Sequence, residues 1–203
     1  MGQYYLGYVN HNGKIKVFDN KVDGEWTGLK LMEHSYMLNS YVSNVVNDLF
    51  YNKGQVCWVG DYYKEDDYSQ VNCNNKELVK SIGDYTWDDS TKRIKCTIKK
   101  VRYLGNCLIV NHTKKLIIDC DDYYEKNKWY EEWEGKKYPW CIHPLPLLTC
   151  SANHSGGSYY GVNQKDCGTW FNDVIEVVVK WDLDDLVKKG YKVTNYHFSE
   201  ERN

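Results

Sequence analysis

The chain has 203 residues, with 26 Lys or Arg against 28 Asp or Glu, so its formal net charge is −2. This length suits one sizeable core, and the basic residues are scattered and form no run typical of nucleic-acid-binding surfaces. We therefore expect a single domain over residues 1–203 that does not bind nucleic acid.

The cysteines and the hydropathy pattern indicate the compartment. Eight cysteines are present, but none forms a Cys-x-x-Cys pair, which disfavours a structural zinc ion. No basic segment followed by a long apolar stretch opens the chain, and no run of 18 apolar residues occurs. We expect a cytoplasmic protein with reduced thiols and no membrane contact, metal or cofactor. Four disulfides in a secreted protein are the alternative.

In the first half of the chain, residues 3–9 and 14–18 are predicted to be strands. Asn10-His11-Asn12-Gly13 joins them, and Asn-Gly is a strong β-hairpin signal. Residues 19–28 are polar and predict a loop. Residues 36–50 carry apolar side chains at helical spacing, with Asn39 or Ser40 as the candidate N-cap, and residues 55–60 predict a buried strand.

In the second half, residues 93–104 predict a strand, and a hairpin follows that runs through Asp119. Residues 121–137 mix charged and aromatic side chains and predict a short helix or an ordered loop. Residues 141–148 contain two prolines, so their start is predicted to be extended. Residues 169–181 predict a strand that closes the sheet, 182–189 a helix ended by Gly190, and 191–198 a last strand or tail.

Residues 110–118 repeat residues 9–17 at an offset of 101, with four of the nine positions identical and two more exchanged between branched aliphatic residues. The repeat predicts two pseudo-repeat halves, at about 1–95 and 96–203. We therefore predict an α+β fold in which two related units, each made of a hairpin, a helix and a strand, pack around a mainly antiparallel sheet. Coincidence between common β patterns is the alternative. We expect the functional site where the halves meet.

Several segments resemble a family of small bacterial and bacteriophage proteins that begin Met-Gly-Gln-Tyr-Tyr. The resemblance covers residues 1–5, 28–35, 58–62, 110–115 and 142–149, and so touches both halves. Members of that family carry Trp-Ala-Gly-Asp where residues 51–54 here read Tyr-Asn-Lys-Gly. The family has no assigned function, so the resemblance implies a cytosolic or phage accessory protein and carries over no catalytic residue.

A first candidate site combines Glu33 and His34, just before the predicted helix, with the end of the following strand. That strand contains Trp58 and is followed by Asp61 and Tyr62. A histidine with a carboxylate across a strand end is suited to acid–base chemistry or to orienting a ligand. The alternative is structural, with His34 in a helix cap and Asp61 in a turn.

A second candidate site is the glycine-rich segment 153–161 with His143 nearby in sequence. Backbone N–H groups of such a loop can approach a phosphate, and neighbouring side chains can add donors. The segment lacks the Gly-Lys-Ser/Thr of a Walker loop, and a flexible surface loop is the alternative reading. Its candidate ligand-binding residues are Asn153, His154, Ser155, Gly156, Gly157 and Tyr159.

These patterns favour binding over catalysis, because no recognisable catalytic set accompanies 19 Tyr and 8 Trp, residue types that suit binding surfaces. We expect an accessory protein, with a phage anti-defence role as one possibility, that sequesters a nucleotide-like small molecule or a host protein. The alternative is an enzyme acting on a nucleotide or another phosphorylated small molecule, with His34 and Asp61 as its catalytic pair. The sequence leaves the oligomeric state open.

Overall fold

The computed structural model describes residues 4–22, 25–28, 30–60, 93–97, 105–151 and 164–198. Within them, nine strands form one sheet in the order β11-β7-β6-β10-β4-β1-β2-β3, with β5 beside β2. The strand pairs are antiparallel except β11 with β7 and β2 with β5. The predicted α+β class with a mainly antiparallel sheet is therefore confirmed.

The first hairpin joins β1 (Tyr5–His11) to β2 (Lys14–Val22). Asn12 and Gly13 have φ of 52° and 91°, as the predicted Asn-Gly turn requires. The prediction of a loop over residues 19–28 was wrong in part, because β2 continues to Val22 and pairs with β3 (Glu25–Trp26). Apolar spacing could not reveal this extension, since it lies at the polar edge of the sheet.

A short helix α1 (Leu31–His34) precedes α2 (Ser40–Asp48). The Asn39 side chain accepts a hydrogen bond from the Tyr41 backbone N–H at 2.9 Å, which makes Asn39 the N-cap. The helix ends before β4 (Gly54–Gly60), which matches the predicted buried strand. β4 lies in the middle of the sheet, where it joins β1 of the first half to β10 of the second half.

The second half begins with the short strand β5 (Ile94–Cys96) and the predicted second hairpin, β6 (Cys107–Asn111) with β7 (Leu116–Asp119). α4 (Cys120–Asn127) follows and is capped by the Asp119 carboxylate. β8 (Trp129–Trp133) and β9 (Lys136–Trp140) then form a separate two-stranded sheet. The short helix predicted within 121–137 is confirmed by α4, whereas the β8–β9 hairpin that follows it was missed.

The predicted extended start at residue 141 is followed by a helix that the sequence analysis missed, α5 (Pro144–Leu148). Pro144 occupies the first turn, where a missing N–H costs no helical hydrogen bond. After the 3-10 turn η3 (Gln164–Asp166) come β10 (Val174–Val179), η4 (Lys180–Asp182), α6 (Leu183–Lys188) and β11 (Lys192–Val193). Gly190, with φ of 87°, ends α6 as predicted.

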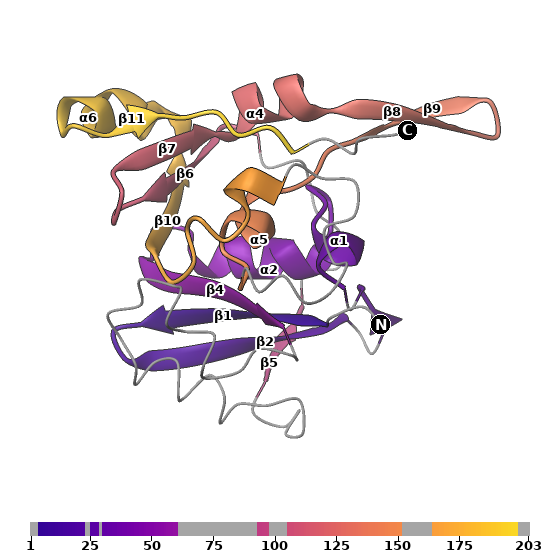
Figure 1. Ribbon diagram of the computed structural model, residues 1–203, viewed down its shortest axis with the longest axis horizontal. Coiled ribbons are helices and arrows are strands. Elements are labelled where there is room, and N and C mark those ends of the chain that lie inside the picture. The colour runs from indigo at the N-terminus through magenta and orange to yellow at the C-terminus, as the bar shows by residue number, and fades with distance from the viewer. Residues whose placement is uncertain are drawn as a thin grey trace.

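The core lies inside the curve of the sheet. Figure 1 shows β1, β2 and β4 below and β6 and β7 above, with α2 and α5 between them. One buried cluster combines Val45 of α2, Val56 of β4, Leu147 of α5 and Ile109 of β6. Residues from both halves of the chain therefore share one apolar interior.

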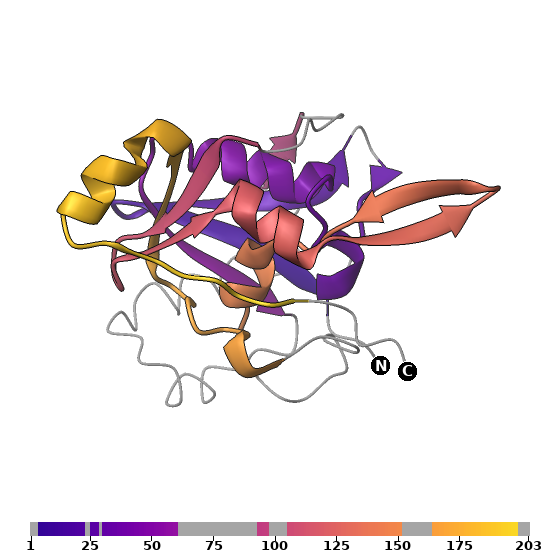
Figure 2. The same cartoon turned by 90° about the horizontal axis from the view of Figure 1, so that it is seen from above.

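Two elements project from opposite ends of this body. Figures 1 and 2 show the β8–β9 hairpin reaching outward at one end and α6 at the other. No helix in the described part of the chain is both long and apolar enough to cross a membrane.

The two hairpins use the same asparagine at their turns, which gives a matched test of stability. Asn10 Oδ1 accepts from Gly13 N, and its amide donates to Gln55. Asn111 Oδ1 accepts from Lys114 N, and its buried amide donates to the Asp173 carboxylate at 2.8 Å.

Hydrogen bonds to charged groups contribute more than neutral ones. We therefore expect Asn111→Ala to lower the free energy of unfolding by about 2–3 kcal/mol and Asn10→Ala by about 1 kcal/mol. Urea unfolding of the two variants measures this difference. Equal losses, or a larger loss at Asn10, would contradict the stronger contribution that we assign to the hydrogen bond between Asn111 and Asp173.

Candidate functional site

A short antiparallel ladder between residues 35–37 and 141–143 joins a described part of the first candidate site to His143 of the second. Tyr36 and Ile142 form its central bridge. The Met37 N–H donates to the Cys141 carbonyl at 3.0 Å, and the His143 N–H donates to the Ser35 carbonyl at 2.8 Å. The residue that follows His34 thus contacts His143, although about a hundred residues separate them in the chain.

His34 lies on the inner side of this ladder and is fully buried. The Trp58 indole N–H donates to His34 Nε2 at 3.0 Å, and the Tyr41 ring packs edge-on against the imidazole at 5.1 Å. Burial lowers the pKa of His34 to about 4, despite smaller opposing effects of the Gly28 backbone and Glu33. His34 is therefore neutral at pH 7, and its Nε2 lone pair is already engaged.

His143 is also fully buried and forms the N-cap of α5. Its Nδ1 accepts from the Leu145 N–H at 3.1 Å, while Nε2 has no hydrogen-bond partner within the described residues. Burial lowers the pKa of His143 to about 3. Its contacts make it a helix cap, a role that the sequence analysis did not consider for this residue.

Trp58 is buried in the core. Its backbone holds the chain near residue 151, so that this segment and the end of β4 leave the core side by side. Trp58 forms a parallel bridge with Cys150, and the Ser151 N–H donates to the Trp58 carbonyl at 2.7 Å. The Gly60 N–H donates to Ser151 Oγ at 3.3 Å. Gly60 and Ser151 are the last described residues before two predicted site segments. The predicted site residues that lie outside the described residues are Asp61, Tyr62, Asn153, His154, Ser155, Gly156, Gly157 and Tyr159.

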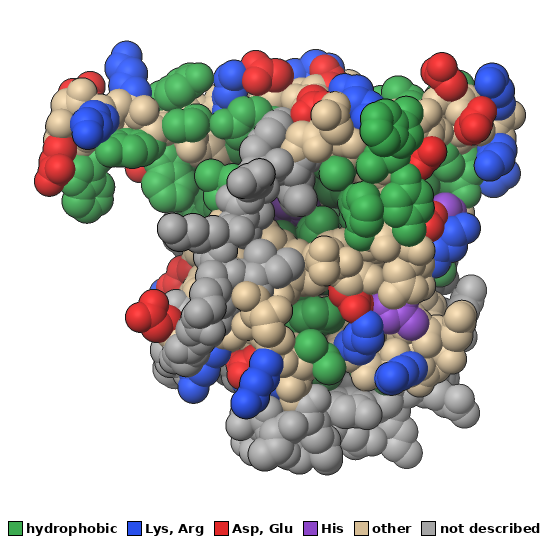
Figure 3. All heavy atoms as spheres, turned by 180° about the vertical axis from the view of Figure 1, so that it is seen from behind, with side chains coloured by type: hydrophobic (Ala, Val, Ile, Leu, Met, Phe, Trp, Pro, Cys, Tyr) green, Lys and Arg blue, Asp and Glu red, His purple; other side chains and the backbone are tan. Residues whose placement is uncertain are grey.

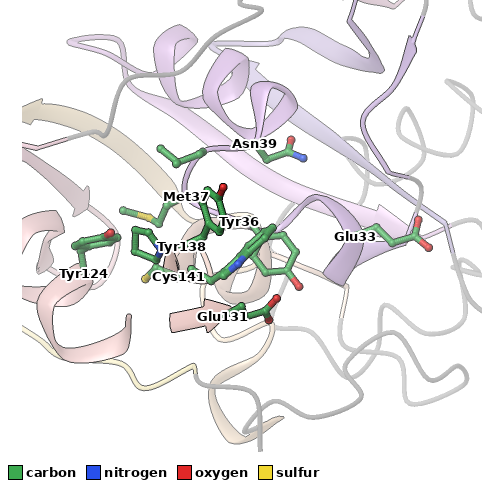
Figure 4. A pocket seen from close by; sticks show the side chains of 11 residues that line it. Glu33, Tyr36, Met37, Asn39, Tyr124, Glu131, Tyr138 and Cys141 are labelled. Atoms are coloured by element: carbon green, nitrogen blue, oxygen red, sulfur yellow. The ribbon is translucent and has the colours of Figure 1, made fainter. Parts of the chain in front are cut away.

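A cavity of about 690 Å³ opens on the outer side of the ladder, and we call it the aromatic pocket. Four of its lining residues are aromatic: Tyr36, Tyr124, Tyr138 and Trp140. Glu33 and Glu131 add carboxylates, and the remaining lining residues are Met37, Leu38, Asn39, Pro139 and Cys141. Figure 4 shows side chains gathered around this opening, with Glu131 beside the rings and Glu33 at the edge of the group, on α1.

The β8–β9 hairpin forms one wall of the pocket and continues beyond it, and we call this hairpin the arm. Trp129 and Trp140 pair at its base, and the Tyr36 ring lies 5.3 Å from the Trp140 ring in an edge-on arrangement. A second cavity of about 350 Å³ follows the arm and shares Glu131, Tyr138 and Trp140 with the pocket. Figure 3 shows hydrophobic side chains along this projecting end of the molecule.

Of the pocket residues, only Glu33 was among the predicted site residues. Tyr36, Tyr138 and Trp140 were missed because they come from segments that the sequence did not place next to one another. The alternation of Trp and Tyr with acidic residues over 121–137 includes two other lining residues, Tyr124 and Glu131, and ends just before Tyr138.

Comparisons with models of protein families, with curated proteins and with solved structures found no match to this chain. Within the described residues, no group of three or more His, Cys, Asp or Glu side chains is placed to hold a metal ion. The geometry of the pocket and the arm is therefore the basis for a functional proposal.

The neutral, buried state of His34 predicts a pH dependence of stability. The unfolded chain takes up a proton near pH 6.5, whereas folded His34 does so only near pH 4. The free energy of unfolding should therefore fall as the pH drops from 6.5 to 4, by on the order of 3 kcal/mol from this residue. His143 adds a loss in the same direction that extends to about pH 3.

His34→Gln tests this assignment, because a glutamine amide oxygen can still accept from Trp58 but does not titrate. Its unfolding free energy, measured in urea between pH 7 and 4.5, should fall by about 1.4 kcal/mol less per pH unit than that of the wild type. The same change at exposed His197 is the matched control and should leave the slope as it is. If the unfolding free energy of His34→Gln falls with pH as steeply as that of the wild type, His34 is not the buried, neutral group that causes the pH dependence.

Proposed function

We propose that this protein binds a ligand or a protein partner, and that the aromatic pocket and the arm form its binding surface. The observation that carries the proposal is a cavity of drug-like size at the base of a projecting hairpin rich in exposed aromatic side chains. Cavities of 300–1,000 Å³ with aromatic walls and a few polar groups are typical binding sites.

The arm supports this proposal because its aromatic side chains contribute little to the core. Trp133 is 71% exposed, Tyr130 56%, Tyr138 47% and Trp140 39%. An isolated two-stranded hairpin is marginally stable in water, and clustered exposed aromatic residues are typical of surfaces that a partner covers. Tyr and Trp are also the residues that most often dominate binding energy at interfaces.

The nucleotide hypothesis from the sequence depends on Asp61 and the glycine-rich segment 153–161, which lie outside the described residues. The aromatic pocket does not favour a phosphate, since Glu33 and Glu131 line it and none of its described lining residues is Lys or Arg. A phosphate there would meet two carboxylates, and the described lining offers no Lys or Arg to bind it. A nucleotide site at the glycine-rich segment remains a separate proposal.

The environment of His34 does not favour the alternative of an enzyme that uses His34 with Asp61. A general base needs a lone pair that can reach a substrate proton. In neutral His34 the Nε2 lone pair accepts from Trp58, so Nδ1 carries the ring proton, and the side chain has no exposed surface. Binding without turnover is therefore the function that the described geometry supports best.

We further propose that the two halves of the chain are copies of one unit. β1 and β2 pair Tyr8 with Val17 and Asn10 with Ile15, and adding 101 to each number gives the pairs of β6 and β7, 109 with 118 and 111 with 116. At the junction, β4 and β10 pair residue 55 with 174 and 54 with 175. Adding 120 to residues 54 and 55 of β4 gives residues 174 and 175 of β10. The pair 55–174 therefore corresponds to the pair 175–54, as a two-fold relation between the halves requires.

The duplication predicts that one turn can replace the other. The double substitution Asn12→Thr and Gly13→Lys writes the second turn into the first hairpin. We expect the fold to be retained with a loss of about 1–2 kcal/mol in unfolding free energy, the cost of giving up glycine at a positive φ. Urea unfolding measures the loss, and a variant that does not fold at all would speak against interchangeable turns.

The resemblance to phage proteins supports the cytoplasm as the site of action and a host protein as one kind of partner. The buried thiols suit a reducing compartment. Burial raises the pKa of Cys96 and of Cys141 to about 12, with Asp19 adding to the effect at Cys96, so both thiols stay protonated at neutral pH.

A calorimetric titration of the purified protein tests the binding proposal. The panel contains choline, lysine amide, neutral aromatic alcohols, and mono-, di- and cyclic nucleotides. We expect at least one class to bind, and Trp140→Leu to weaken that binding about tenfold, because Trp140 lines both cavities. The matched control is Trp181→Leu, a change at a tryptophan that is 85% exposed and lines neither cavity.

If no class binds at millimolar concentration, or if the two tryptophan variants weaken binding equally, the pocket is not the binding site. Circular dichroism of both variants checks that each retains the fold.

A further inference from the structure

We infer that the aromatic pocket accepts a cationic nitrogen group, either a small ammonium compound or the side chain of a Lys or Arg residue in a bound segment. This inference rests on the proposed function and names the chemistry of the ligand. It follows from the charge of the pocket, the arrangement of its rings and the continuation of its surface along the arm.

All charged residues in the described lining of the aromatic pocket are acidic. Glu33 on α1 and Glu131 on β8 both line the pocket, so two different elements contribute carboxylates, with Glu131 beside the rings and Glu33 at the edge (Figure 4). No Lys or Arg belongs to its described lining. The two lysines of the arm, Lys136 and Lys137, line neither the pocket nor the neighbouring cavity. A cation is therefore attracted, and an anion repelled, at short range.

The Glu33 side chain is in contact with Lys30 and remains accessible to solvent. Its carboxylate accepts from the Lys30 N–H at 3.0 Å and lies 3.5 Å from Lys30 Nζ, and both side chains are about half exposed. Exposed pairs of this kind contribute little energy, so a ligand can compete with Lys30 at small cost. Glu131 accepts from the Trp129 indole N–H at 3.3 Å, which fixes the direction of its side chain.

The rings supply the second attraction. Tyr36 comes from the α1–α2 connection, Tyr138 and Trp140 from β9, and Tyr124 from α4, so several elements present aromatic surface to one space. Ring faces attract ammonium and guanidinium groups, most strongly when Trp takes part and water is partly excluded. Tyr124 already makes such a contact within the chain, since Lys128 Nζ lies 5.5 Å from its ring centre.

The remaining walls suit the carbon atoms that accompany a cation. Met37, Pro139 and Cys141 are apolar or weakly polar and lie beside the rings. Methyl groups of a quaternary ammonium, or the methylene stem of a lysine or arginine, bury well against such a surface. A strongly hydrated inorganic cation would gain nothing from these contacts.

The neighbouring cavity extends the same chemistry outward along the arm. It is lined by Glu131, Glu132, Trp133, Glu134, Tyr138 and Trp140, which again combine carboxylates with aromatic rings. An extended basic segment that places one side chain in the pocket can continue along this cavity. A small ammonium compound would occupy the pocket alone.

The first experiment compares choline with its uncharged carbon isostere, 3,3-dimethylbutan-1-ol, by calorimetric titration of the full chain. The two ligands have the same shape and differ in charge. We expect choline to bind about tenfold more tightly, within the range of cation–π attraction in a partly desolvated site. Equal affinities would overturn the inference.

Variants then assign the attraction to the pocket. Glu131→Gln should weaken choline binding roughly threefold and leave the isostere unaffected, because only the charge changes. Trp140→Leu should weaken choline about tenfold. Asp184→Asn, which removes a charge on α6 away from the pocket, is the matched control and should change neither ligand.

A peptide of alternating Lys and Ser, set against one of alternating Glu and Ser, separates the two sources of the cation. If the Lys peptide binds at least tenfold more tightly than choline, and Trp133→Leu removes that gain, the natural ligand is a basic segment that binds along the arm. Choline binding without that gain assigns a small ammonium compound. If nucleotides bind in a Trp140-dependent way and neither cation does, the pocket is a binding site but this inference fails. If nothing binds, the proposed function fails as well.

Discussion

The close approach of three strands at Gly54 is the constraint on which the rest of the structure depends. β4 pairs there with β1 and with β10, and this junction joins the two halves of the sheet. A Cβ atom on Gly54 would lie 2.5 Å from Val9 Cγ1 and 3.0 Å from His11 Cε1, so a larger residue would push β1 and β4 apart. The junction between the two halves of the sheet therefore requires glycine at position 54.

The proposed binding surface depends on that interior through Trp58. β4 carries Trp58 into the core, where it holds His34 and the segment that ends at Ser151. The ladder between residues 35–37 and 141–143 is thereby anchored on its inner side by buried, neutral histidines. Its outer side presents Tyr36 and Cys141 to the pocket, so the same short ladder contributes to the core on one side and to the pocket on the other.

The arm differs from the rest of the molecule in what stabilises it. Most strands are held by burial on at least one face, whereas β8 and β9 have exposed or half-buried residues along their whole length. Their attachment is the packing of Tyr36 against Trp129 and Trp140 at the base. A surface with so little burial gains most from a partner that covers its rings, which is why binding fits this region better than a structural role.

Local pattern in the sequence was enough for the elements whose cause is local. The Asn12-Gly13 turn, the helix capped by Asn39, the buried strand β4 and the glycine that ends α6 each depend on a few neighbouring residues, and each was predicted. The arm and α5 were missed for opposite reasons. The arm alternates aromatic and charged residues with both faces exposed, so it lacks the one-sided pattern that marks a strand, and α5 is a buried five-residue helix with prolines in it. The pocket could not be predicted, because Tyr36 and Trp140 belong to segments about a hundred residues apart, and only the ladder between residues 35–37 and 141–143 brings them together. The sequence by itself therefore determined the β1–β2 and β6–β7 hairpins, helices α2 and α6 and the class of fold, whereas the tertiary structure decided which aromatic and acidic side chains meet, since that depends on long-range packing.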